Sequence, residues 1–150
     1  MKKTVKKLLI AAAIVMGFAL SSNAQELGVR FGDVSAGNVA IDAIFSTGDF
    51  SRIHADVSFG GGGVGVDALW DFLYRPLGGE AFYWYAGVGP YIWIDDPFWF
   101  GAVGELGLEY QFNSIPLSLS LDWRPALSIV EETDFHGGGF GFNIRYVFAK

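Results

Sequence analysis

His54, Asp56 and Ser58 are the residue types of a hydrolytic triad, and they occupy every second position of one short segment. Alternate residues lie on the same face of an extended strand, where successive side chains on that face are about 6.6 Å apart. That spacing is too long for the hydrogen bonds that a triad needs along one strand. We therefore expect these side chains to pack inside the fold, and we predict no catalytic residues.

Three other stretches could bind ions. His136 closes the acidic segment Val130–His136, which could hold a cation or present a histidine to a substrate, but a solvated loop is the favoured interpretation. Gly60–Gly63 resembles a phosphate cradle in composition; it has neither a following helix nor a lysine, so it predicts a hairpin turn. Asp95 and Asp96 could contact Ca²⁺, although two adjacent carboxylates are a weak signal. We expect no metal site and no cofactor.

The first 24 residues predict a cleaved secretory signal peptide. Four lysines precede the apolar run Leu8–Leu20, and Ser22–Ala24 supplies the small residues of a cleavage site. The run is short for a bilayer span, although an uncleaved anchor is the alternative. Cleavage would leave residues 25–150 as a single domain with 16 acidic and 6 basic residues. So acidic a chain is a poor nucleic-acid partner, and the absence of cysteine excludes a lipoprotein anchor and disulfides.

The elements that position these residues are predicted from alternation. In Leu117–Ile129, apolar and polar side chains alternate over thirteen residues. Such a pattern predicts a strand with two unlike faces, longer than the usual strand of a soluble protein and suited to a tilted membrane strand of about 9–11 residues. Pro90 and Pro125 cannot donate to a ladder, so we expect each near a rim or bulge.

Eight alternating segments predict an all-β fold, an eight-stranded antiparallel up-and-down transmembrane β-barrel with short loops. The segments are Glu26–Gly32, Asn38–Phe45, Arg52–Phe59, Val64–Tyr74, Phe82–Ile94, Phe100–Phe112, Leu117–Ile129 and Gly137–Phe148.

Side-chain volume predicts which face is outside. The apolar faces carry roughly 34 side chains of valine size or larger. The interior of an eight-stranded barrel is only just wide enough to be filled by side chains, so it cannot hold that many large ones. The other faces are rich in glycine and serine with a few charges. We therefore expect the apolar face to contact lipid and the charged face to line the lumen.

Two residue sets follow from this orientation. The predicted lumen charge network consists of Arg30, Asp42, Arg52, Asp56, Asp67, Asp71, Glu105, Glu109, Asp122, Arg124 and Arg145. The predicted membrane girdle consists of Trp70, Tyr74, Trp84, Trp123 and Tyr146, because tryptophan and tyrosine favour the membrane–water interface.

The segment Gly141–Phe148 resembles the terminal strand signal of bacterial outer-membrane barrels, with Gly141, Ile144, Tyr146 and Phe148 at the signal positions and two residues after the final aromatic. The stretches Trp84–Pro90 and Gly107–Ala126 resemble small outer-membrane barrels of the OmpA/OmpX class, which have no assigned activity. The resemblance implies a Gram-negative outer-membrane location and recognition of the last strand by the barrel-assembly machinery.

The sequence thus predicts a non-catalytic integral outer-membrane barrel with a structural or surface-interaction role. The expected partners are outer-membrane lipids and, during insertion, the barrel-assembly machinery; we expect a monomer. Three alternatives stay open: a lipid A-modifying enzyme with polar groups at the outer rim, a narrow porin-like pore, and a secreted lipocalin-like carrier with the two faces inverted.

Overall fold

The fold is taken from a computed structural model, which describes residues 24–34, 38–60, 63–79, 81–94, 99–129 and 133–148, together with Lys2, Lys3, Lys6, Lys7 and Ile10. The predicted signal peptide lies almost entirely outside the described residues, although Ala24 is already the first residue of the first strand. Within the described ranges, no helix is long and apolar enough to cross a membrane.

In the part of the chain that the structure describes, ten antiparallel strands make up a single sheet. They are β1 (Ala24–Gly32), β2 (Val39–Gly48), β3 (Ser51–Gly60), β4 (Gly63–Pro76), β5 (Phe82–Ile94), β6 (Trp99–Gln111), β7 (Leu117–Trp123), β8 (Ala126–Ser128), β9 (Asp134–His136) and β10 (Phe140–Val147).

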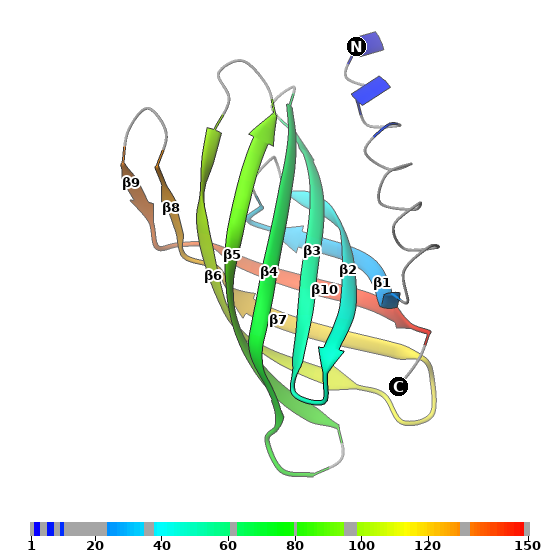
Figure 1. The fold of residues 1–150 in the computed structure, drawn as a ribbon. Helices are drawn as coiled ribbons and strands as arrows, with labels where there is room; N and C mark the ends of the chain where they lie inside the picture. Colours follow the sequence, from blue (N-terminus) through cyan, green and yellow to red (C-terminus); the bar gives the residue numbers. More distant parts are fainter. Residues whose placement is uncertain are drawn as a thin grey trace.

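The sheet closes on itself. Consecutive strands pair from β1 to β7, β7 pairs with β10, and β10 returns to β1, so that all strands except β8 and β9 form an eight-membered ring (Figure 1). The predicted eight-stranded antiparallel barrel is therefore confirmed. Glu26 pairs with Val147 at the end of the barrel where β1 begins and β10 ends.

The seventh predicted strand is divided. It runs as β7 to Trp123, breaks at Arg124 and Pro125, and resumes as β8 against the same partner β6. Pro125 therefore lies at a strand break, as predicted. Pro90 does not lie at a rim; it is inside β5, where it pairs with Ala102 of β6, and no pair forms at Pro90 on the β4 side.

The β8–β9 hairpin extends past the ring. Asp134–His136 was predicted as part of a loop, but these residues form β9 and pair with β8. In Figure 1, β9 lies at the left of the view and β1 at the right, and within the described ranges β9 pairs only with β8. The β8–β9 hairpin is thus attached to β6 and is not part of the eight-strand ring.

The two faces of the ring have opposite chemistry. Along β10, Gly141, Asn143, Arg145 and Val147 are buried inside, while the aromatic and aliphatic residues between them face outward. The same alternation holds for β7, where Ser118, Ser120 and Asp122 are buried and Leu121 is 60% exposed. The interior is therefore polar, and the outer surface carries the large apolar side chains.

A bulge in β4 overturns one girdle prediction. The register with β5 shifts between Asp71 and Leu73, so one residue is added to β4 at that point. Every later residue of β4 changes face, because alternation continues from the shifted position. Tyr74 consequently points into the lumen, where its hydroxyl donates to Glu109 Oε1 at 2.9 Å. The membrane-girdle prediction was wrong for Tyr74.

Candidate functional site

The polar interior is the candidate site. All eleven residues of the predicted lumen charge network are buried, at 4% exposure or less. They come from β1, β2, β3, β4, β6, β7 and β10, with Arg124 at the break after β7. Because charges removed from water must be paired or hydrated, the contacts among them decide what the interior can do.

His54 lies at the centre of this network. Its Nε2 is 2.6 Å from Asp42 Oδ1 and its Nδ1 is 2.8 Å from Glu105 Oε1. A ring that contacts a carboxylate through each nitrogen donates from both, which describes an imidazolium held between two acids. Asp56, on the same strand face, is 3.9 Å away from the ring, beyond hydrogen-bond distance. His54, Asp56 and Ser58 are all buried and do not form a triad.

Arg124 contacts acids of three strands at the β8–β9 end of the network. Its Nε donates to Glu105 Oε2 at 2.9 Å and its Nη1 to Asp56 Oδ2 at 2.5 Å, with Asp67 Oδ2 3.6 Å away. The break between β7 and β8 frees the chain at this point to aim the guanidinium inward. The charges of Glu105 and Asp56 are thereby compensated by one side chain.

Arg145 and Arg52 share a second group of acids, nearer the end of the barrel where β1 begins. Arg145 donates to Asp42 Oδ2 at 2.7 Å and to Glu109 Oε2 at 2.6 Å. Arg52 donates to Asp71 Oδ2 at 2.9 Å and also contacts Glu109 Oε2 at 2.9 Å. Glu109 therefore accepts from two guanidinium groups, which suits the planar fork of arginine.

Aromatic rings complete the packing around Arg52. Its Cζ lies 4.1 Å from the Tyr74 ring centroid and 4.7 Å from that of Tyr85. The Tyr85 hydroxyl donates to Asp122 at 2.9 Å, and Asp122 also accepts from Arg30 Nη1 at 2.7 Å. The ionic groups and the rings therefore form one connected interior.

Glycines provide the space for these long side chains. A Cβ on Gly107 would overlap the Tyr85 ring and hydroxyl, and a Cβ on Gly141 would overlap the Arg30 guanidinium. Both glycines lie on the inward face of their strands. These two glycines thus leave room on the inner face for the Tyr85 and Arg30 side chains.

The prediction omitted several members of this interior. Glu26 is 4% exposed and accepts from Ser118 at 2.7 Å, and Asn143 is fully buried and donates to Ser120 and Asp122. Glu26 has the same parity as Arg30 on β1, so alternation alone could have found it. The central role of His54 depends on contacts between distant strands, for which the sequence carries no signal.

Two sets of potential metal ligands lie in this network. Asp42, His54 and Asp56 form one, and His54, Asp71 and Glu105 the other, each with ligand atoms within 4.8 Å. An arginine contacts every carboxylate in both sets, and Arg124 Nη2 lies 3.2 Å from His54 Nε2. Cationic groups therefore already occupy the surroundings of these ligands, and the geometry fits a salt-bridge network.

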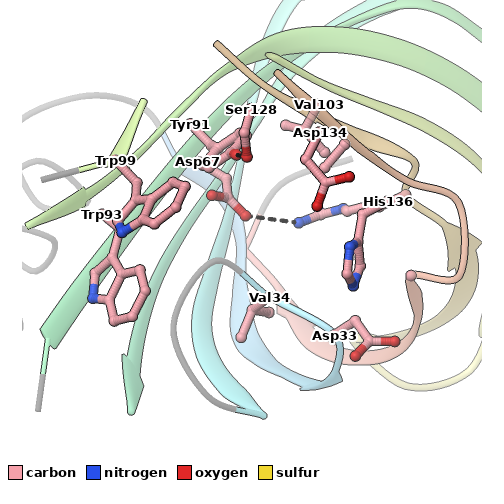
Figure 2. Close-up of a pocket in the computed structure, with 13 residues that line it drawn as sticks. Asp33, Val34, Asp67, Tyr91, Trp93, Trp99, Val103, Ser128, Asp134 and His136 are labelled. Carbon is pink, nitrogen blue, oxygen red and sulfur yellow. Dashed lines mark hydrogen bonds and ion pairs between the residues drawn. The ribbon is translucent and has the colours of Figure 1, made fainter. Parts of the chain in front are cut away.

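A cavity lies at each end of the network. The one at the end where β8 and β9 meet has a volume of about 410 Å³ and is shown in Figure 2; Asp67 and Arg124 belong to its lining. The other has about 490 Å³ and includes Glu26 and Arg52, at the end where β1 begins. The charged side chains between them fill the middle of the barrel.

The remaining predicted residues lie elsewhere. His136 is in β9 and lines the first cavity, and Gly60 pairs with Gly63 across the tip of the β3–β4 hairpin, as expected for a turn. Asp95 and Asp96 fall outside the described residues. The girdle residues Trp70, Trp84, Trp123 and Tyr146 face outward, as do the signal residues Ile144 and Phe148. The signal residue Gly141 faces inward on β10.

Comparisons of the chain with known protein families, curated proteins and solved structures found no match. The fold and the interior chemistry therefore have to support any functional conclusion on their own.

Proposed function

We propose that this protein is an integral outer-membrane β-barrel, exported through a cleaved signal peptide, whose lumen is closed by its own side chains. Its role is structural or one of surface interaction, without catalysis, and it acts as a monomer. Its partners are outer-membrane lipids and, during insertion, the machinery that assembles barrels.

The observation that carries this proposal is the inverted distribution of side chains. The described charged residues in the middle of the barrel strands are buried, while Trp70, Leu106, Leu121 and Ile144 are exposed on the outer surface. A water-soluble barrel would carry the charges outside and keep such residues inside. A bilayer reverses the preference, and a closed ring satisfies every backbone group there.

The closed interior favours a non-conducting, non-catalytic barrel. Arg145, Arg124 and His54 extend into the lumen and contact acids of other strands at 2.5–2.8 Å. Each of these groups is committed to a salt bridge, so none is left poised as a nucleophile or general base. The acids and bases of the charge network lie along the lumen, whereas a lipid A-modifying enzyme would need its reactive groups at the outer rim.

The test is to locate the protein and then to measure what it does there. We expect it in the membrane fraction, migrating faster on unheated gels than after boiling, because folded barrels resist detergent. Recovery in the soluble fraction would contradict the proposal. In planar bilayers we expect no steady conductance, and the lipid A mass spectrum should not change with expression; stable channels or modified lipid A would assign a pore or an enzyme instead.

A further inference from the structure

We propose that the cavity at the β8–β9 end of the barrel binds a small organic cation, an ammonium group carried on a flat apolar body. Its volume of about 410 Å³ lies within the range of small-molecule sites, roughly 300–1,000 Å³. This inference goes beyond the proposed function and does not depend on it, since the cavity walls are the same whatever surrounds the barrel.

One wall of the cavity is aromatic. Trp93 and Trp99 are cross-strand partners on β5 and β6, and Tyr91 precedes them on the same inward face of β5. Figure 2 shows the two indole rings next to each other on one side of the cavity. A Cβ on Gly63 would overlap the Trp93 indole, so this glycine lets the ring lie against β4. Tryptophan faces are the strongest aromatic partners for cations.

The facing wall is acidic. Asp33 and Asp134 lie across the view from the indoles in Figure 2, with His136 between them. The Asp33 carboxylate accepts from the Phe140 amide at 3.2 Å. The Asp134 carboxylate forms no hydrogen bond or ion pair with any described residue, and its β9 position is exposed. Among the described residues, this acid therefore has no counter-charge.

The floor does not cancel this negative charge. Arg124 is the only arginine in the described lining, and its guanidinium is committed to Asp56 and Glu105 below the cavity. Of the three carboxylates in the lining, Asp67 forms an ion pair with Arg124 at 3.6 Å, whereas no arginine forms an ion pair with Asp33 or Asp134 among the described residues. An anionic ligand would be repelled by such a wall, whereas a cation is attracted.

The geometry favours an organic cation over a metal ion. Metal binding needs several oxygen or nitrogen ligands that converge within bonding distance, and among the described residues no acid of this cavity belongs to a set of ligands close enough to do so. The carboxylates instead face indole rings across a space of small-molecule size. Aromatic faces with acids near them are the arrangement that recognises ammonium groups.

The experiment is calorimetric titration of the detergent-extracted full-length gene product with benzyltrimethylammonium. We expect saturable binding that Trp99→Leu and Asp134→Asn each weaken by about fivefold or more. Asp49→Asn is the matched control, since Asp49 lines the cavity at the opposite end; its affinity should equal that of the unchanged protein. Heat-modifiable migration of each variant verifies that the barrel is folded.

Several results would overturn the inference. Absence of binding at millimolar benzyltrimethylammonium would show that the cavity is not a cation site. If phenylacetate bound as tightly as benzyltrimethylammonium, the cavity would not be selective for positive charge. Equal weakening by Asp49→Asn and Asp134→Asn would mean attraction to the acidic protein as a whole. Undiminished binding to folded Trp99→Leu, or full competition by Ca²⁺, would indicate a simple cation site and contradict the aromatic one.

Discussion

Arg145 of β10 and Asp42 of β2 are joined by a 2.7 Å ion pair that passes over the strand between them. That strand contributes Gly28, which pairs with Arg145 on one side and with Asp42 on the other. Because glycine has no side chain, the arginine can reach over β1. The lumen is thus tied together by contacts between strands that are not neighbours in the sheet.

Replacing Arg145 should destabilise the barrel strongly. In Arg145→Met, Asp42 would keep only His54 and Glu109 only Arg52 as a cationic partner among the described residues. Removing one member of a buried ion pair costs about 3–5 kcal/mol. The free energy of unfolding can be measured by guanidinium titration in lipid vesicles. Arg75→Met is the control, because Arg75 is exposed and its guanidinium lies over the Phe50 ring, an interaction worth about 1 kcal/mol or less. Equal losses would contradict the network.

Arg30 and Asp122 should be energetically coupled. Their side chains form a buried hydrogen bond of 2.7 Å between β1 and β7. A double-mutant cycle with Arg30→Met and Asp122→Asn should give a coupling energy of about 1 kcal/mol or more, since residues in one salt-bridge network are not additive. The same cycle for Arg75 and Asp122, which share no described contact, should be additive. Additivity in both cycles would refute the direct pair.

Gly107 should not tolerate a side chain. The methyl of Gly107→Ala would push the Tyr85 ring away and strain its bond to Asp122, and overpacking of this kind costs about 1–3 kcal/mol. Thermal unfolding followed by heat-modifiable migration measures the effect. Gly138→Ala is the matched control, because a Cβ there meets nothing within 4 Å. Equal stability of the two variants would mean that the lumen has spare room.

A charge on the outer face should be costly in lipid. Leu121 is 60% exposed on β7, and Leu121→Arg should lower the free energy of unfolding in vesicles by about 2–4 kcal/mol if the residue lies near the bilayer midplane. Leu77→Arg, in the exposed segment after β4, should have little effect. A water-facing surface would accept both arginines equally, and that result would favour a soluble barrel.

The sequence predicted the ring well because one face of each strand is chemically unlike the other. Alternation of period two locates strands and their faces, so segments such as Phe82–Ile94 agree with β5 at both ends. The volume of the apolar side chains, too large for the barrel interior, then predicted which face of the strands lies outside. Leu121 outside and Arg145 inside follow from these two arguments alone.

What the sequence could not predict depends on local irregularity and on long-range contacts. The bulge after Asp71 has no glycine or proline to mark it, so Tyr74 was placed on the wrong face. The β8–β9 hairpin arises where an acidic segment folds back on a broken strand, and the polarity of that segment predicted a loop. The position of His54 between Asp42 and Glu105 requires strands that are far apart in the chain.

The most direct test of the account asks what surrounds the outer face. The chain has no cysteine, so single cysteines can be introduced at Leu121 and Ile144, and at Asn113 in the β6–β7 turn, and spin-labelled in vesicles. We expect labels at Leu121 and Ile144 to collide mainly with oxygen dissolved in the lipid, and the label at Asn113 to collide mainly with a water-soluble nickel chelate. Preferential collision of all three labels with the nickel chelate would contradict it.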